Sequence, residues 1–417
     1  MAHWTVATLT LALAVGCSSP PPPPPTPCAS TPLTKGPWTM RATTDGASVF
    51  WETREAPSCV AIGVTPEAGG PEAIVAGVAT MTTVLTGYGT PRPNVPLDLA
   101  GTFFVNRVDV TGLPAGACFS FRVRTTAPDE TRGRFCTARP SGEPFKFFAI
   151  GDTNPILGHT ADVLDHTLSE QPEFLLHMGD MHYYSSTETW AYWFLHMAPM
   201  LRAGALFPAV GNHDGFATDD TPTDYQDYTD RLFHAPSLDG VAGPMSSWYR
   251  FSWGGVWFFT IDTEEPYDSG SAQYTWLTDK LVDATKQPGF RFSAVFMHRN
   301  LYTLGDATPN VDVRKSLAPL FEANKVRLVF SGHMHGYERF EVGDITYLTT
   351  AGGGGQINDV NYNVPNYPAD VPLRVKGLPD YHAMLLDVTP IGSASQLHGR
   401  AIDGSGAVID EFTHLIP

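Results

Sequence analysis

The sequence is poor in basic side chains. Its 26 lysines and arginines face 43 aspartates and glutamates, which gives a formal net charge of −17 at pH 7. A chain with this charge repels nucleic-acid backbones and anionic lipid, and it has no basic surface on which either could be held. Polynucleotide binding is therefore not indicated.

The apolar run near the beginning of the chain, Val6–Gly16, is too short to span a bilayer, which takes about 20 residues. It is typical of the apolar region of a signal peptide. The residues Ala14 to Cys17 resemble a bacterial lipobox, in which Cys17 would be acylated. Residues 1–17 are therefore predicted to direct export and to leave a lipid anchor. A plain signal peptide cut near Ser18, or a buried apolar segment, is the alternative.

Residues 18–35 contain an unbroken proline run, Pro20–Pro25. Proline fixes φ and removes a hydrogen-bond donor, so such a run forms an extended, semi-rigid spacer. We expect residues 18–35 to be a linker that holds a folded domain away from a membrane. A proline-rich ligand for another protein is the alternative.

Cysteine is scarce, with 5 in the whole chain, all within its first third. The rest of the chain offers no thiolate to a metal. If Cys17 carries a lipid, an even set remains, which is typical of disulfides in an exported protein. Cys118 and Cys136 lie on two expected strands joined by a turn, so they are predicted to pair, which leaves Cys28 with Cys59 by elimination. Buried free thiols are the alternative.

Residues 36–140 alternate short patterned runs with turn residues, which predicts a β-sandwich. The turn Thr111–Gly116 resembles the one that precedes a late strand in fibronectin type III domains, although Phe119 stands where that family often has a tyrosine. The expected strands are Trp38–Thr43, Ala47–Glu52, Cys59–Val64, Phe103–Val110, Cys118–Thr125 and Arg134–Thr137.

Residues 144–417 change to buried apolar strands that alternate with helical patterns. Leu157, Ala161, Leu164 and Leu168 repeat at helical spacing between the first two of these strands. This order predicts βαβ units and an α/β domain. The expected strands are Lys146–Gly151, Phe174–Met178, Leu206–Val210, Val256–Ile261, Phe292–Met297, Arg327–Phe330 and Ile345–Thr349.

Side chains that can bind a metal follow several of these strands. In open α/β sheets the loops beyond the carboxyl ends of the strands converge, so ligands far apart in the sequence can meet there. Each motif alone is weak, because Gly-Asp and Gly-Asn pairs are common turns and a single histidine is usually an ordinary polar group. Their order, each at a strand end, predicts a metal site. The residues are Asp152, Asp180, Asn212, His298 and His333.

The types of these side chains suit particular metals. Carboxylate, imidazole and amide ligands favour iron, zinc or manganese. Two metals about 3.5–4 Å apart need a shared ligand, and a carboxylate with two oxygens can bridge them. Asp180 is the expected bridge.

The ordered motifs GD, GDxxY, GNH, VxxH and GHxH, found between Phe147 and Arg339, resemble those of the purple acid phosphatases, a branch of the binuclear metallophosphoesterases of the calcineurin-like superfamily. The resemblance implies a four-layer αββα catalytic domain after a fibronectin III-like β-sandwich. It also implies a binuclear centre of Fe(III) with Fe, Zn or Mn. The implied ligands of the first metal are Asp152, Asp180, Tyr183 and His335. Those of the second metal are Asp180, Asn212, His298 and His333.

Tyr183 decides between branches of this superfamily. Most other branches have a histidine two residues after the first aspartate, whereas this chain has Asn154 there and supplies Tyr183 instead. This favours an iron bound by tyrosinate. A core or rim aromatic beside Tyr184 is the alternative.

In the implied reaction, two cations polarise the phosphate and lower the pKa of a bound water, and the resulting hydroxide attacks phosphorus in line. His213 matches a histidine that the family places beside the ligands, and it is the expected catalytic residue. It would stabilise developing charge or protonate the leaving group. The alternative is a hydrogen bond to Asp214 that orients the loop.

The expected substrate-binding residues are Asn154, His213 and Arg299. Thr153-Asn154 replaces the Leu-Gly that usually follows the first aspartate, so a polar side chain is expected to reach the phosphate pocket. The loop from Arg299 to Val313 lacks the histidines of plant-type members, which leaves Arg299 as a candidate.

Two other segments carry weaker signals. The acidic segment Asp219–Asp230 matches no EF-hand spacing and is interpreted as a surface loop rather than a Ca²⁺ site. Gly352–Gly355 lacks the lysine and the helix of a P-loop, so tight backbone packing near the metals is expected there.

The leading hypothesis is an exported acid phosphatase that hydrolyses small-molecule phosphate monoesters, lipid-anchored in the bacterial cell envelope or secreted. A phosphodiesterase or nucleotidase is the alternative, because the same two-metal chemistry attacks diesters when the pocket admits them. A third hypothesis is an envelope lipoprotein that binds a partner through its sandwich while its metal domain is degenerate. The sequence predicts neither the particular ester nor the oligomeric state.

Overall fold

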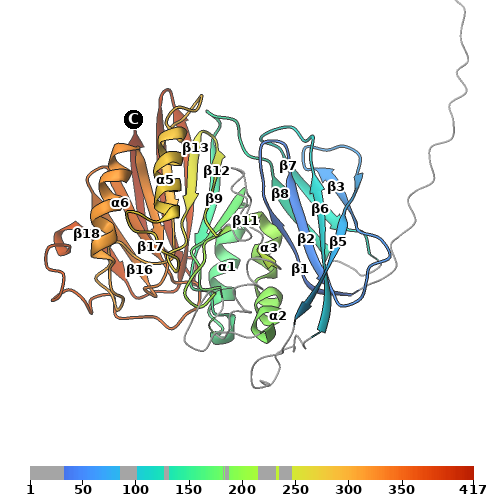
Figure 1. Cartoon of the computed structure of the whole chain (residues 1–417), viewed down its shortest axis with the longest axis horizontal. Helices are drawn as coiled ribbons and strands as arrows, with labels where there is room; N and C mark the ends of the chain where they lie inside the picture. Colours follow the sequence, from blue (N-terminus) through green and yellow to red (C-terminus); the bar gives the residue numbers. More distant parts are fainter. Residues whose placement is uncertain are drawn as a thin grey trace, which may run out of the picture.

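The computed structural model describes residues 32–84, 101–125, 131–181, 183, 187–214, 232–233 and 247–417. Cys17, Cys28, the proline run and the Asp219–Asp230 segment lie outside the described residues. The described strands form three sheets, with helices on the outer faces of two of them (Figure 1). None of the described helices is both long and apolar enough to cross a membrane.

The largest sheet draws strands from both ends of the chain. The parallel strands β9, β10 and β11 form its centre, and they confirm the strands expected at residues 146–151, 174–178 and 206–210. Antiparallel C-terminal strands extend one side, and N-terminal strands extend the other. The order is β21 (Val408–Ile416), β20 (Ala394–Asp403), β19 (His382–Ile391), β9 (Phe145–Ile150), β10 (Phe174–His177), β11 (Ala205–Pro208), β1 (Leu33–Met40), β2 (Ala47–Thr53), β6 (Gly101–Val110) and β5 (Val78–Val84).

The second sheet stacks on the first. Its strands β13, β14, β15 and β17 run parallel and confirm the strands expected after residue 255. Antiparallel strands flank this parallel group on both sides. The order is β12 (Tyr249–Trp253), β13 (Val256–Thr260), β14 (Ser293–Phe296), β15 (Val326–Ser331), β17 (Ile345–Thr350), β16 (Tyr337–Val342) and β18 (Arg374–Leu378).

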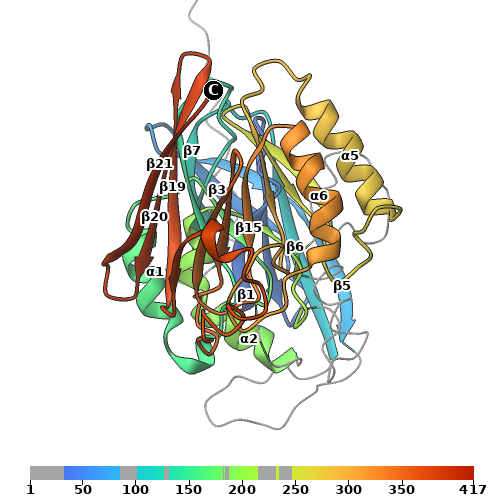
Figure 2. The same ribbon diagram turned by 90° about the vertical axis from the view of Figure 1, so that its left-hand side faces the viewer.

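Helices cover the outer faces of these two sheets and complete four layers. Phe148 of the first sheet shares a core with Leu164 and other helical side chains, and Val295 of the second sheet shares another with Leu317. Figure 2 shows α1 on one side of the strands and the pair α5 and α6 on the other. The helices are α1 (Thr160–Leu168), α2 (Thr187–His196) and α3 (Ala198–Ala203) on the first sheet, and α5 (Ala272–Ala284) and α6 (Val311–Ala323) on the second.

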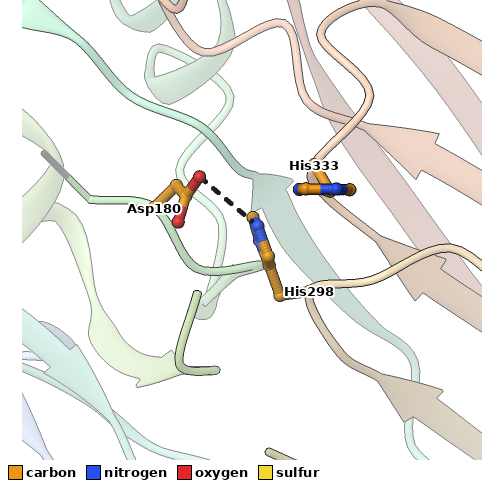
Figure 3. A group of neighbouring side chains, drawn as sticks. All are labelled: Asp180, His298 and His333. Carbon is orange, nitrogen blue, oxygen red and sulfur yellow. Dashed lines mark ion pairs between the residues drawn. The ribbon is translucent and has the colours of Figure 1, made fainter. Parts of the chain in front are cut away.

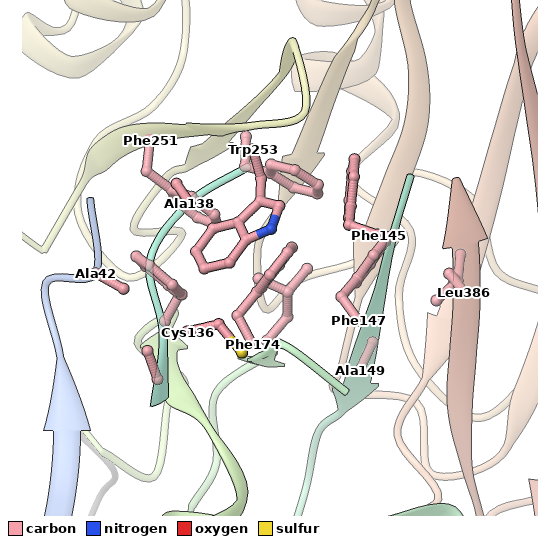
Figure 4. Packing of buried hydrophobic residues seen from close by; sticks show 14 of the residues in the cluster. Ala42, Cys136, Ala138, Phe145, Phe147, Ala149, Phe174, Phe251, Trp253 and Leu386 are labelled. Atoms are coloured by element: carbon pink, nitrogen blue, oxygen red, sulfur yellow. The ribbon is translucent and has the colours of Figure 1, made fainter. Parts of the chain in front are cut away.

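Aromatic rings fill the space between the two stacked sheets (Figure 4). Phe147 of β9 stacks on Phe174 of β10 with ring centroids 5.1 Å apart. Both rings meet Phe258 of β13 edge-on, at 5.4 and 5.3 Å. Burying one phenylalanine contributes about 1.5–3 kcal/mol, and an aromatic pair adds about 0.5–1.5 kcal/mol. This packing fixes the distance between the sheets, and therefore between side chains at their strand ends.

Residues 33–136 contribute strands to two sheets that face each other. Trp51 of β2 and Val108 of β6, in the ten-stranded sheet, share a core with Phe121 and Phe135 of a separate sheet. Two further strands in this region, β4 and β5, were not expected from the sequence, and their side chains are largely exposed. The separate sheet has the order β4 (Ala73–Ala76), β3 (Ala61–Pro66), β7 (Cys118–Val123) and β8 (Arg132–Cys136).

Strand β1 joins this N-terminal region to the rest of the molecule. It pairs in parallel with β11, with Thr39 opposite Ala205. Trp38 packs against Phe194 of α2 at a centroid distance of 4.9 Å, and its indole N–H donates to the Leu232 carbonyl at 3.1 Å. β1 is therefore part of the ten-stranded sheet, and it packs against the helices that cover this sheet.

The strand β1 begins earlier than the sequence indicates. β1 starts at Leu33, inside the range expected to be a linker. Lys35 is only 2% exposed, and its ammonium lies 2.8 Å from the Glu52 carboxylate, which also accepts from the Thr34 hydroxyl at 2.8 Å. A buried charge is tolerated when it is paired and hydrogen-bonded. These contacts hold the last residues of the expected linker against β2.

The disulfide between Cys118 and Cys136 is confirmed. The two residues are directly opposite each other on β7 and β8, as the hairpin pattern predicts. Closing a loop of this length stabilises the fold by about 3 kcal/mol in the chain-entropy model. Cys59 is also disulfide-bonded, while its expected partner Cys28 lies outside the described residues.

Candidate metal centre

The predicted ligands follow the carboxyl ends of strands from both stacked sheets. Asp152 and Asp180 come directly after β9 and β10, and Asn212 lies in the turn after β11. His298 and His333 come after β14 and β15 of the second sheet. Because the aromatic core holds the two sheets face to face, these side chains meet in one place. The contacts divide them into two adjacent groups.

The first group consists of Asp152, Tyr183 and His335. The Tyr183 hydroxyl lies 3.1 Å from Asp152 Oδ1 and 2.8 Å from His335 Nε2. The third distance, from His335 Nε2 to Asp152 Oδ1, is 3.4 Å. A carboxylate, a phenol and an imidazole thus converge on one point. In this arrangement Tyr183 is not a rim aromatic, because its oxygen faces the other two groups.

The second group consists of Asp180, Asn212, His298 and His333. His298 Nε2 lies 3.3 Å from Asp180 Oδ2 and 3.0 Å from Asn212 Oδ1. Ligand atoms of Asp180, His298 and His333 all lie within 4.8 Å of one another (Figure 3). The two groups are in contact, because the backbone N–H of His333 donates to both carboxylate oxygens of Asp152 at 3.0 Å.

The imidazoles are oriented as metal ligands usually are. The Nδ1 atom of His298 lies 2.8 Å from the Met178 carbonyl, and that of His335 lies 2.7 Å from the Gln356 carbonyl. A hydrogen bond from one ring nitrogen to a carbonyl fixes the tautomer and leaves the other nitrogen free to bind a metal. In both residues the other nitrogen, Nε2, faces the centre. This donor set of carboxylate, phenol, amide and imidazole fits a pair of hard or borderline cations.

Three of these ligands have left-handed backbone conformations. The φ angles are 57° at Asp152, 51° at Asp180 and 69° at His333. Such a conformation costs on the order of 1–3 kcal/mol for a residue other than glycine, and it persists only where surrounding contacts hold it. The Asp180 turn is held by the His213 N–H, which donates to Asp180 Oδ1 at 2.8 Å. Backbone strain at three residues on the turns that carry the predicted ligands indicates a functional site.

Glycines allow the ligand loops to approach each other. A Cβ on Gly211 would lie 2.3 Å from Asp180 Oδ1, and one on Gly332 would lie 2.6 Å from Asp152 Oδ2. A Cβ on Gly355 would lie 2.8 Å from the His335 ring. Tight packing of the 352–355 segment beside the ligands, expected from the sequence, is therefore confirmed.

Of the pair Thr153-Asn154, which was expected to supply a polar side chain to the phosphate, Thr153 is directed into the protein. It is fully buried, and its hydroxyl donates to the Met181 carbonyl at 2.8 Å and accepts from the Trp193 indole N–H at 2.9 Å. His177 Nε2 lies 3.1 Å from the same hydroxyl. Thr153 follows Asp152, and Met181 follows Asp180. The hydrogen bond from the Thr153 hydroxyl to the Met181 carbonyl therefore connects the two loops that carry the aspartates. Asn154 is also buried, at 5% exposed, and it precedes the short 3-10 helix Pro155–Leu157.

His213 lies beside the first group. Its ring is half-buried, 4.7 Å from the Tyr183 ring between centroids. The Asp214 carboxylate accepts from the backbone N–H groups of Met181 and Gly211, each at 3.0 Å. In the described part of the chain, these backbone bonds fix the loop. The alternative role for His213 was a hydrogen bond to Asp214 that orients the loop. Among the described residues, the Asp214 carboxylate instead accepts from these two backbone N–H groups.

Arg299 lies beside the second group. Its Nη1 is 3.4 Å from His333 Nε2, and its guanidinium is paired with Glu264. Glu264 was not among the sequence candidates. It belongs to the Asp262-Thr263-Glu264 turn that follows β13, so the strand-end pattern used for the metal ligands would have found it.

In the metal-free protein, the charges and the burial of the centre favour the protonated forms of His298 and Tyr183. Burial disfavours charge on His298, but the Asp180 carboxylate outweighs it and raises the pKa of His298 to about 10. Burial, and then the charges of Asp152 and Asp180, raises the pKa of Tyr183 well above its ordinary value. Burial lowers the pKa of His333 to about 3.

Metal uptake is therefore expected to release protons and to tighten as pH rises. A cation that binds the second group must displace the proton of His298, and one that binds the first group must displace the proton of Tyr183. Both side chains still carry these protons at neutral pH, because the pKa of each is raised. The logarithm of the apparent Zn²⁺ association constant should rise by about one per pH unit for each proton displaced. Calorimetric titration of metal-free protein with Zn²⁺ between pH 6 and 8 measures this slope. An affinity independent of pH would contradict the assignment of these ligands.

Residues 145–337 match the family model described as calcineurin-like phosphoesterase. The matched segment runs from β9 to the start of β16 and contains all the residues of both groups. The chain therefore contains a calcineurin-like phosphoesterase domain.

The chain is also similar in sequence to several individual proteins. The chain is 28% identical over 271 residues to an uncharacterized protein of Mycobacterium tuberculosis, a match that covers 56% of this chain and 50% of that protein. It is 23% identical over 283 residues to purple acid phosphatase 13 of Arabidopsis thaliana, covering 56% and 51%. It is 27% identical over 246 residues to phosphoenolpyruvate phosphatase of Allium cepa, covering 55% and 48%. The chain thus spans about half the length of these relatives.

Solved structures share the fold. A purple acid phosphatase from yellow lupin (Lupinus luteus) seeds superposes with a TM-score of 0.71 at 16% identity, covering 90% of this chain and 73% of that one. The structure of PhoD superposes with a TM-score of 0.60 at 12% identity, covering 92% and 89%. Together with the family model and the sequence relatives, these similarities support a purple acid phosphatase-like metallophosphoesterase.

Proposed function

We propose that the protein hydrolyses phosphate monoesters at a binuclear metal centre, as an acid phosphatase. The observation that carries this proposal is the convergence of the two ligand groups, with the Tyr183 hydroxyl between Asp152 and His335. Asp152, Asp180, Tyr183 and His335 would hold Fe(III). Asp180, Asn212, His298 and His333 would hold Fe, Zn or Mn.

The roles of the protein follow from the charges around the centre. When bound, the two cations would polarise the phosphoryl oxygens and activate a water. His213 lies at the edge of the first group, where its imidazole can give a proton to the leaving oxygen as the P–O bond breaks. Asp180 belongs to both implied ligand sets and carries the charge that a bridge requires.

The proposal extends to the setting of the enzyme. The disulfide supports export, since such bonds persist in oxidising compartments. We propose a lipid anchor at Cys17, a cell-envelope or secreted location, and a fibronectin III-like accessory sandwich formed by the N-terminal strands. The substrate would be a small-molecule phosphate ester rather than a nucleic acid, which the charge of −17 disfavours.

The visible spectrum and metal content of the purified protein test this function, together with its activity on nitrophenyl phosphate and bis-nitrophenyl phosphate. We expect about two metals per chain including iron, a broad charge-transfer band lost in Tyr183→Phe, and faster hydrolysis of the monoester. A colourless protein with two zinc or manganese ions would contradict the tyrosinate-iron centre while keeping the hydrolase. Faster hydrolysis of the bis-ester would replace the monoesterase with a diesterase, and a protein that binds no metal would overturn the proposal.

A further inference from the structure

Arg299 is held in one orientation beside the second ligand group. Its Nε and Nη2 donate to the two carboxylate oxygens of Glu264, each at 2.8 Å. Its backbone N–H donates to the Thr263 hydroxyl at 3.1 Å. A two-point bond between a guanidinium and a carboxylate fixes the plane of the guanidinium as well as its position. The side chain is therefore immobilised before any substrate arrives.

Glu264 is held in turn by a buried network. Its N–H donates to Asp262 Oδ1 at 2.9 Å. The Asp262 N–H donates to Gln273 Oε1 at 2.9 Å, and Gln273 Nε2 returns a bond to the Asp262 carbonyl at 2.7 Å. Gln273 is 1% exposed within α5. The turn after β13 is thus anchored to a helix, and it supports the arginine rather than a metal.

The guanidinium keeps donors for a further acceptor. It carries five N–H groups, of which two bind Glu264 and one faces His333 Nε2 at 3.4 Å. The side chain is 36% exposed, whereas that of Glu264 is 12% exposed. Arg299 is therefore the more exposed partner of the pair, and its guanidinium lies next to His333 of the second group.

We propose that Arg299 binds a non-bridging oxygen of the substrate phosphoryl group, and that Glu264 is the positioning residue that orients it. This inference rests on the proposed function and specifies its substrate class. A phosphate monoester has three non-bridging oxygens, so one would remain for Arg299 if two were bound at the metal centre that the two ligand groups would hold. A diester has only two and leaves none. The pair therefore selects monoesters over diesters.

Titration of the metal-loaded protein with inorganic phosphate tests the binding role without turnover. Arg299→Gln should weaken phosphate binding by about 10–100-fold, the usual effect of losing a hydrogen bond to a charged group. Glu264→Gln should weaken it by a smaller factor, because the guanidinium remains but loses its orientation. Arg299→Lys should weaken phosphate binding less than Arg299→Gln does, because lysine keeps the positive charge but not the planar guanidinium.

The ratio of activities tests the selectivity. Arg299→Gln should raise KM for nitrophenyl phosphate and lower the ratio of kcat/KM between that monoester and bis-nitrophenyl phosphate by about tenfold or more. Glu264→Gln should shift the ratio in the same direction. A merely structural role would lower both activities together and leave the ratio unchanged.

Arg107→Gln is a matched control. Arg107 is an ion-paired arginine of similar exposure, 37%, bound to Asp109 on β6, which lies beyond β1 and β2 from β11 in the ten-stranded sheet. Metal content and melting temperature should equal the parent values in all variants. Unchanged phosphate affinity in Arg299→Gln, or equal losses on both esters, would overturn the inference. If the parent protein hydrolyses neither ester, the proposed function fails, while the phosphate titration still decides the role of Arg299.

Discussion

Asp180→Asn is expected to lower kcat for a phosphate monoester by on the order of 10³-fold, because losing the several kcal/mol that two metals supply costs tenfold for each 1.4 kcal/mol. Asparagine keeps the shape of the side chain and tolerates the left-handed backbone found at this position, where φ is 51°. The substitution therefore removes the bridging charge with little disturbance of the turn. Metal analysis should show fewer metals per chain.

Asp312→Asn is the control for the change in charge. Asp312 is exposed on α6, where it pairs with Lys315 at 2.8 Å. Both substitutions change the net charge by the same amount, so a loss of turnover common to both would reflect the overall field of the protein. Full metal content and normal turnover in Asp180→Asn would show that Asp180 is not a ligand.

Gly332→Ala is expected to disable both ligand groups at once. The added methyl would lie 2.6 Å from Asp152 Oδ2, 2.8 Å from the Met178 carbonyl and 2.9 Å from His298 Nδ1. Two of these atoms belong to ligands, and the carbonyl is the one that orients His298. Displacing an orienting contact costs about 10–100-fold in metal affinity, and here ligands on both sheets must move. We expect weaker binding of both metals and a loss of turnover of at least that size.

Gly404→Ala separates the clash from the effect of glycine itself. Both glycines have ordinary backbone angles, but a Cβ on Gly404 would meet Asp162 Cβ at 3.3 Å and Val163 atoms only at 3.9 Å. This control should bind metal and turn over as the parent protein does. Denaturant unfolding of both variants distinguishes a displaced centre from an unfolded one. Parent-like metal affinity in Gly332→Ala would mean that the loops can separate without cost.

The sequence predicts the site better than it predicts the architecture around it. Asp152, Asp180, His298 and His333 could be found because each follows an apolar strand, and the carboxyl ends of parallel strands share an edge. The pattern does not say which sheet each strand joins. The two aspartates follow strands of one sheet and the two histidines follow strands of the other, and the buried core between the sheets brings the four together.

Errors in the prediction arise from local backbone geometry. The pair Thr153-Asn154 was expected to bring a polar side chain to the phosphate, with Asn154 as the candidate, but Asp152 has a positive φ, and the Thr153 side chain is directed into the protein. A sequence pattern carries no signal for such a turn. Glu264 was missed for another reason. It follows β13 as the predicted ligands follow their strands, but the sequence does not show that its partner is Arg299 rather than a metal.

The parallel pairing of β1 with β11 has a consequence for any shortened form of the protein. A chain that began at residue 144 would leave β11 as an edge strand, without the pairing of Thr39 and Ala205. It would also remove Trp38 from its place against α2, exposing apolar surface there. Such a fragment would tend to associate edge to edge. The N-terminal strands therefore cover the β11 side of the central parallel strands and part of the helical layer beside them.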